Sequence, residues 1–241
     1  MSVHWRRVGA IFRKELSEYR RNGVIIGTMA VIPVIVVIFP LIEILALPAS
    51  SSSAFLNGDP LAILLDIPAV VPAVVAAYAV VGERQQGTLE PVLTTPIPRE
   101  EFLLGKALAS FVPSIAISLA VYALFLAVVE LFAQPAVASA VLQGPDLLAQ
   151  VLFTPLLAAW SIWAAIAVSS RSSDIRVAQS LGTLAAVPTL LVTNLISFNV
   201  IHPSLGLTLA FAAVLLFVDG LGWRIASTMF DRERLVTGTR S

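Results

Sequence analysis

The chain has 241 residues, of which 58% are hydrophobic and only 12% are charged. Soluble domains carry about a quarter charged residues, so this composition excludes a soluble globular domain and predicts a protein embedded in lipid. The 15 basic and 15 acidic residues cancel, and the absence of cysteine excludes disulfides, thiolate metal sites and cysteine nucleophiles.

Residues 1–22 form the first predicted element, an amphipathic interfacial helix that precedes the membrane-spanning part. Apolar residues recur at steps of three and four, which places them on one face of a helix. They are Trp5, Val8, Phe12, Leu16 and Tyr19, and the residues opposite them are Arg6, Arg7, Arg13, Lys14, Arg20 and Arg21. Such a helix lies at the membrane surface with its apolar face at the acyl boundary. Its role is either that of a simple topology anchor or a mechanical one.

Six apolar segments follow, and each is long enough to cross a bilayer. A hydrocarbon core of about 30 Å requires about 20 helical residues, and lipid offers the backbone no hydrogen-bond partners outside the helix itself. The predicted spans are residues 24–47, 61–81, 102–132, 147–168, 177–198 and 205–223. The sequence therefore predicts an all-α polytopic membrane protein in which residues 23–241 form a six-span transmembrane domain.

The basic residues determine the predicted orientation of the spans. All 15 lie in the N-terminal segment, around the loops that follow the second and fourth spans, or beyond the last span. Short loops rich in lysine and arginine stay in the cytoplasm. Both termini are therefore expected to be cytoplasmic, in a multi-pass protein of the cell membrane. An odd number of spans would place one basic group outside.

The sequence contains no recognisable catalytic or metal-binding constellation. His4 and His202 are the only histidines, and the predicted topology places them on opposite sides of the membrane. A serine elbow is absent, and Gly105 and Lys106 lack the remaining residues of a phosphate-binding loop. We therefore expect no enzyme activity, no metal and no cofactor in this chain.

Two acidic residues lie inside predicted spans. Asp66 is about one turn inside the outer end of the second span, and Asp219 is about one turn inside the inner end of the sixth. A charge near the bilayer centre costs about 2.5 to 3.5 kcal/mol, so each acid invites a functional explanation such as an ion or proton site. Alternatively, snorkelling or a local partner, such as Arg224 for Asp219, lowers this cost.

The fifth predicted span carries a short series of polar side chains in its outer half. They are Thr189, Thr193, Asn194 and Ser197. Spacing by four residues places the hydroxyl groups along one face of the helix, where they can line a translocation path. The alternative is that they only form hydrogen bonds with neighbouring helices, at about 0.6 kcal/mol each.

The inner loop between the second and third predicted spans is the most unusual stretch. Gly87 interrupts the descending helix, and Thr88 is a favourable N-cap for a short helix over residues 89–94. Pro96 and Pro98 end that helix. Its exposed apolar residues are Leu89, Val92 and Leu93. Such a helix is either a docking element for another protein or a helix that rests on the membrane surface.

This loop resembles the first cytoplasmic loop of permease subunits of ABC transporters, in the type 2 exporter family. The residues that match the family pattern are Glu83, Arg84, Gly87, Thr88, Leu89, Glu90, Leu93, Thr95, Pro96, Ile97 and Arg99. The inner loop at residues 169–179 and the C-terminal residues 230–234 are also similar to the family. Together with residues 13–16, the resemblance extends over essentially the whole chain.

The resemblance implies one half of the membrane part of an ATP-driven exporter. Two permease subunits, as a homodimer or heterodimer, would form the pathway, and two separate ATPase subunits with ATP and Mg would dock beneath them. No nucleic acid is expected as a partner. The coupling loop would be residues 83–101, with its coupling residues Glu83, Gly87, Thr88, Leu89, Glu90, Val92, Leu93 and Arg99. The outer connection at 199–204 is too short for the re-entrant helices of some relatives.

Two other functions are compatible with a six-span protein. A secondary transporter would use Asp66 or Asp219 as its ion or proton site, and inverted repeats would favour it, although none is visible. A membrane assembly subunit would have no transport activity of its own. Substitution of Leu89 and Glu90 distinguishes these functions, because only an ABC permease is expected to lose a bound ATPase. The substrate stays open: few charges in the spans suit apolar or amphipathic cargo, yet related permeases also serve ions and polar compounds.

Overall fold

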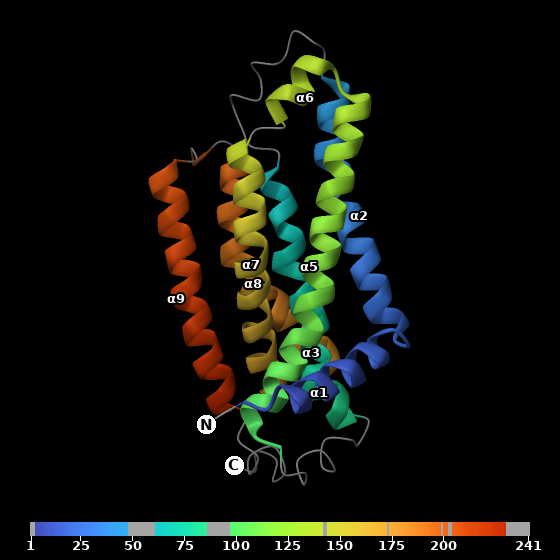
Figure 1. Cartoon of the computed structure of the whole chain (residues 1–241), viewed down its shortest axis with the longest axis vertical. Coiled ribbons are helices and arrows are strands. Elements are labelled where there is room, and N and C mark those ends of the chain that lie inside the picture. Colours follow the sequence, from blue (N-terminus) through green and yellow to red (C-terminus); the bar gives the residue numbers. More distant parts are fainter. Residues whose placement is uncertain are drawn as a thin grey trace.

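A computed structural model describes residues 3–47, 61–85, 97–141, 144–172, 174–198, 200–201 and 204–229. Within these ranges every regular element is a helix, which confirms the predicted all-α class (Figure 1). The helices are α1 (Trp5–Tyr19), α2 (Gly23–Ala46), the short 3-10 helix η3 (Ala62–Leu65), α3 (Asp66–Gln85), α5 (Arg99–Phe132), α6 (Pro135–Val141), α7 (Gly144–Arg171), α8 (Ile175–Ser197) and α9 (Leu205–Met229).

Five of these helices are long and apolar enough to cross a membrane, namely α2, α5, α7, α8 and α9. They begin and end within three residues of the predicted spans, except that α9 continues to Met229 where the prediction ended at residue 223. The second predicted span corresponds to η3 and α3, whose apolar part Ala62–Tyr78 is shorter. Helix α6, which follows the C-terminal end of α5, was not predicted (Figure 1).

Side chains next to the helix starts explain where two of the spans begin. The Asn22 side chain accepts hydrogen bonds from the backbone N–H groups of Val24 and Ile25, at 3.0 and 3.3 Å, at the start of α2. The Asp174 carboxylate accepts from Arg176 and Val177 in the same way at the start of α8. Both caps satisfy backbone donors that have no partner within their own helix.

Helix α3 lies at the centre of the bundle and contacts α2, α5, α7 and α8. Its contact with α7 is held by two serine hydroxyl groups, because Ser161 donates to the Ala69 carbonyl at 2.6 Å and Ser169 donates to the Ala77 carbonyl at 2.7 Å. Gly182 of α8 also lies so close that an added Cβ would be 3.3 Å from the Ala165 Cβ. Small residues therefore allow α3, α7 and α8 to pack closely against one another.

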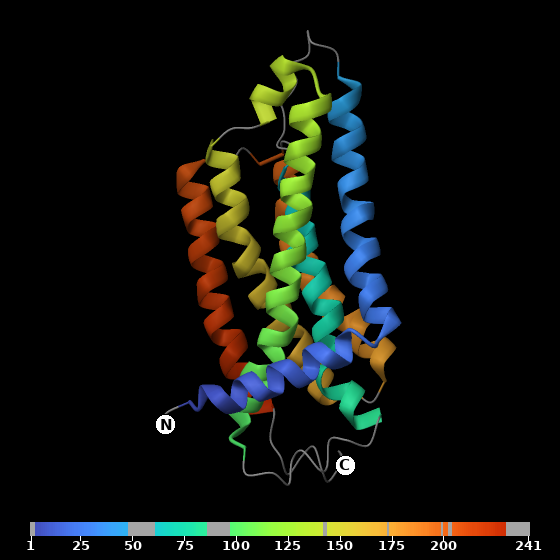
Figure 2. The ribbon, with the colours of Figure 1, turned by 45° about the vertical axis from the view of Figure 1, so that its right-hand side comes forward.

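Helices α2 and α9 lie on opposite sides of the bundle and expose large apolar side chains (Figures 1 and 2). In α2, Phe39 is 71% exposed, and in α9, Phe217 is 68% exposed. A soluble protein would bury such side chains, whereas lipid accommodates them. Helix α1 differs in direction, since it lies across the lower ends of the bundle helices (Figure 2).

Candidate functional site

We call the end of the bundle where α1 lies the inner end and the opposite end the outer end (Figure 2). The inner end contains the described part of the predicted coupling loop. The predicted helix at residues 89–94 and the coupling residues Gly87, Thr88, Leu89, Glu90, Val92 and Leu93 lie outside the described residues. Glu83 is described only as part of the α3 backbone. Arg99 begins α5, is exposed, and lies 3.3 Å from Glu100. The structure therefore defines the two helices that flank the loop, which are α3 and α5.

Helix α1 packs directly against the first turns of α5. At the crossing point, a Cβ added to Gly105 would lie 2.6 Å from Cγ2 of Ile11 and 3.3 Å from the carbonyl oxygen of Val8. No real Cβ approaches another carbon that closely, so only glycine permits this approach of the two helices. The crossing point lies just after the coupling loop in the sequence.

A buried ion pair joins the same two helices. The Lys106 ammonium lies 2.8 Å from the Glu15 carboxylate, and their side chains are 0% and 3% exposed. The ammonium also lies 5.0 Å from the centre of the Phe102 ring, which favours a cation. Lys14, which is half-exposed, lies 3.3 Å from the same carboxylate. Two charges are thus removed from solvent but remain paired with each other.

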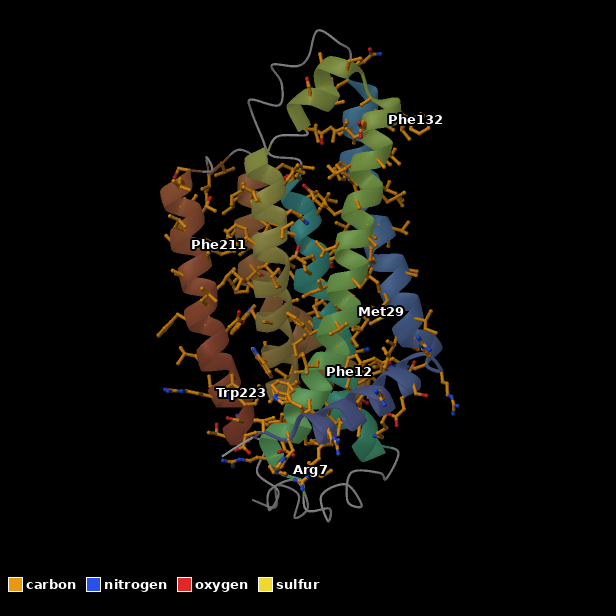
Figure 3. All side chains as sticks on the ribbon, viewed as in Figure 1. Arg7, Phe12, Met29, Phe132, Phe211 and Trp223 are labelled. Atoms are coloured by element: carbon orange, nitrogen blue, oxygen red, sulfur yellow. The ribbon has the colours of Figure 1, made fainter. Side chains whose placement is uncertain are left out.

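Three further polar contacts flank this ion pair. Glu101 accepts a hydrogen bond from the backbone N–H of His4 at 2.9 Å and lies 3.6 Å from the guanidinium of Arg7, which is labelled in Figure 3. At the other end of α1, the hydroxyl groups of Tyr19 and Ser110 are 3.1 Å apart. Helix α1 is therefore attached to α5 along its whole length, and the two helices can move as one unit.

The buried face of α1 is rotated slightly from the apolar stripe in the sequence. Its buried residues are Val8, Ile11, Glu15 and Tyr19. Trp5, the first residue of the predicted stripe, is 68% exposed. Sequence reasoning missed Glu15 and Lys106, although their positions carry a signal. Glu15 lies seven residues after Val8 and four before Tyr19, which is the spacing of one helix face.

At the outer end of the bundle, three of the predicted polar residues come together. The Asp66 carboxylate accepts hydrogen bonds from the Thr193 hydroxyl at 2.7 Å and from the Asn194 amide at 2.9 Å. Thr189 instead donates to the Ala186 carbonyl in its own helix, and Ser197 is half-buried. Asp66 is thus connected to α8 by neutral donors, which lowers the cost of its partial burial.

Asp219 has a different environment from Asp66. Its Oδ1 atom is buried and has no hydrogen-bond partner within the part of the chain that the structure describes. Arg224, the partner suggested by the sequence, is exposed and forms no ion pair with it. Five positions along a helix turn through about 140° from the starting direction, so the two side chains point to different faces. The suggestion of Arg224 as a partner is wrong.

Among the residues that the structure describes, neither end of the bundle holds a cluster of metal-binding side chains. In the described ranges, no three histidine, aspartate or glutamate side chains lie close enough together to hold a metal ion. His4 is exposed and contributes only its backbone N–H to the contact with Glu101, and His202 lies outside the described residues. The polar contacts described above at the two ends join helices to one another.

Comparison of the sequence with protein families gives a match that covers most of the chain. The family is described as ABC-2 family transporter protein, and its model matches residues 9–215. The chain belongs to this family. It is a transmembrane permease component of an ABC transporter and not the ATPase component. A search of curated proteins found no match.

The matched range of this ABC-2 family permease contains the polar contacts at both ends of the bundle. It begins inside α1 and ends inside α9, so it includes the buried ion pair between Glu15 and Lys106 as well as Asp66 with its donors on α8. Asp219 lies four residues beyond its end. The family match thus supports the permease assignment for the part of the chain that forms the bundle.

Proposed function

We propose that this chain is one of two permease subunits of an ATP-driven exporter. The second subunit is either another copy or a related chain, and two ATPase subunits, which hold ATP and Mg, dock on the inner end of the bundle. The translocation pathway forms between the paired permeases. The family match over residues 9–215 is the observation that carries the proposal.

In this proposal the chain crosses the membrane six times, with η3 and α3 as the second span. Helix α3 has 20 residues, and at 1.5 Å per residue this length covers about 30 Å, the thickness of the hydrocarbon core. The flanking spans α2 and α5 both begin at the end of the bundle where α1 lies (Figure 2). Since α2 ends at the opposite end of the bundle, α3 must cross the membrane to bring the chain back to the start of α5.

The cytoplasmic side in this proposal is the end with α1. Arg99, Arg171 and Arg176 lie in the first or last turns of helices at that end, and Arg224 lies five residues before the end of α9. Helix α1 adds four more basic residues, and Arg20 and Arg21 follow it directly. Basic residues favour the cytoplasmic side, so both termini are cytoplasmic in the cell membrane. Helix α1 then lies at the inner membrane surface, with its exposed arginines near the lipid headgroups.

Coupling to the ATPase takes place at residues 83–101. Leu89, Val92 and Leu93 provide the apolar contact, while Glu83, Gly87, Thr88, Glu90 and Arg99 shape and orient the loop. The loop joins α3, which is central in the bundle, to α5, which is attached to α1. Displacement of the loop therefore acts on the core through α3 and on the membrane surface through α5 and α1.

Co-purification from the source membrane tests this function. The Leu89→Asp and Glu90→Lys variants should lose a bound ATP-hydrolysing subunit that the wild-type chain retains. Leu205→Asp is the matched control, because it introduces the same charge at an exposed leucine at the opposite end of the bundle. All variants should elute as a single folded species. Recovery of a permease that transports without any ATPase, or ATPase binding that survives Leu89→Asp, would overturn the proposal.

A further inference from the structure

Asp219 interrupts an apolar stripe on α9. The stripe has the spacing of one helix face, and its members are Ala212, Leu215, Asp219, Gly222 and Ala226. On the outer side of Asp219, Ala212 and Leu215 pack in the same apolar cluster as Phe153 and Leu157 of α7. These contacts fix the direction in which the outer half of the stripe faces.

The contacts on the inner side of Asp219 are also made with α7. A Cβ added to Gly222 would lie 2.9 Å from the Cβ of Trp163, and the rings of Trp163 and Trp223 meet edge to face at 5.1 Å. In Figure 3, Phe211 and Trp223 mark the outer and inner parts of this contact. Asp219 lies between the two sets of contacts, so its carboxylate faces the interface between α9 and α7.

This carboxylate is an acidic group whose position the contacts between α9 and α7 do not explain. Its Oδ1 atom is buried, and the described residues provide neither a hydrogen-bond donor nor a basic partner for it. Asp66, by contrast, has two donors. An acid without a partner in a membrane span is costly and is usually retained for a function. A cationic group is the partner that a carboxylate lacks here.

An apolar groove lies along the same stretch of α7. Its lining residues, from α5 and α7, are Leu104, Ala107, Leu108, Phe111, Ala159, Ile162 and Trp163. Its volume is about 170 Å³. An apolar cavity of about 150 Å³ is large enough to bind benzene, so this groove has room for one aromatic ring or a short alkyl chain. Trp163 belongs both to the groove and to the contact with α9.

We propose that the groove and Asp219 together bind a lipophilic cation. The apolar part of the ligand occupies the groove between α5 and α7, and its positive group lies against the Asp219 carboxylate. Trp163 and Phe111 add aromatic faces that attract a cation. This proposal names the class of cargo for the permease and so rests on the proposed function. Charge complementarity distinguishes this ligand from an ordinary lipid chain, which would need no carboxylate.

Photolabelling of the full chain in lipid nanodiscs tests the proposal. The probe is 4-azidobenzyl-trimethylammonium, and its control is the neutral analogue in which carbon replaces the ammonium nitrogen, so that size and shape are the same. Labelled residues are identified by peptide mass spectrometry. We expect the cation to label the groove residues about tenfold more than the neutral analogue, which is the ratio given by one charge-assisted contact.

Variants separate the role of the charge from that of the fold. Asp219→Asn should reduce labelling by the cation to the level of the neutral analogue, and Asp219→Glu should retain the preference. Glu130→Gln, at an exposed position near the outer end of α5, should change nothing. Ala159→Phe, which fills the groove, should reduce labelling by both probes.

Equal labelling by the two probes in the wild-type protein, or an unchanged preference in Asp219→Asn, would overturn the proposal. This assay needs no ATPase, so its failure is separate from failure of the permease assignment. Co-purification of the ATPase should be the same for Asp219→Asn and the wild-type chain. A variant that elutes as an aggregate is replaced by Asp219→Ser, for which the same loss of preference is expected.

Discussion

The two ends of the bundle are held together by different kinds of polar contact. At the inner end, charged groups pair across α1 and α5, with Lys106 and Glu15 both almost completely buried. At the outer end, one carboxylate, that of Asp66, accepts from two neutral donors on α8. The inner contact joins α1 to α5, whereas the outer contact joins α3 to α8.

This difference shows how strongly each end depends on its polar contacts. A buried charge that loses its partner is very costly, whereas a neutral donor in a membrane protein readily finds another acceptor. Removing one charge of the ion pair between α1 and α5 should therefore destabilise the protein strongly. Removing one donor to Asp66 should destabilise it only slightly. The following substitutions test that contrast.

Lys106→Met should have the largest effect. It removes the main partner of Glu15 and leaves a carboxylate that is 3% exposed beside the half-exposed Lys14. Breaking a buried pair in this way costs about 3 to 5 kcal/mol of the free energy of unfolding. The free energy is measured by denaturant titration in detergent micelles and followed by circular dichroism.

The control for this variant is Lys14→Met, which should cost less than about 1 kcal/mol because Lys14 is half-exposed. The double variant Glu15→Leu with Lys106→Met should recover most of the lost stability, because neither charge of the buried pair then remains. If Lys106→Met were no worse than Lys14→Met, the ion pair would not hold the two helices together.

Gly105→Ala should have an intermediate effect on the same contact. The added Cβ would overlap with Ile11, whose Cβ and Cγ2 atoms lie 2.7 and 2.6 Å away, so α1 must shift. Overpacking of this kind costs about 1 to 3 kcal/mol. The shift is measured by the rate of disulfide cross-linking between cysteines introduced into α1 and α5. This rate should be lower in Gly105→Ala than in the protein with glycine at this position. Gly27→Ala is the control, because nothing lies within 4 Å of its added Cβ.

Thr193→Val should have the smallest effect. It removes one of the two hydrogen bonds that Asp66 accepts and keeps the shape of the side chain. Such bonds between membrane helices contribute about 0.6 kcal/mol on average, and Asn194 still donates to the carboxylate. The same unfolding titration measures the change. A loss as large as that of Lys106→Met would contradict the contrast between the two ends.

The spans could be predicted from the sequence because their signal is local. Twenty apolar residues in succession determine a membrane helix without reference to the rest of the chain. For this reason α2, α5, α7 and α8 begin and end within three residues of the predicted positions. Helix α6 has only seven residues and no apolar run of sufficient length, so it carried no comparable signal.

The polar contacts could not be predicted because they join residues far apart in the sequence. Lys106 and Glu15 are 91 positions apart, and Asp66 and Thr193 are 127 apart. The sequence identified Asp66 and Thr193 separately, as an intramembrane acid and as part of a polar series, but no local pattern indicates that they meet. The coupling role of residues 83–101 stays a prediction, since most of that loop lies outside the described residues.

The two serine contacts between α3 and α7 restrict how the bundle can move. Ser161 and Ser169 are eight residues apart, and so are their acceptors Ala69 and Ala77. Sliding α3 along α7 by a single residue, about 1.5 Å, would break both hydrogen bonds at once. A force applied to the end of α3 at Gln85 should therefore displace α7 by the same amount, and relative motion should occur between this helix pair and its neighbours.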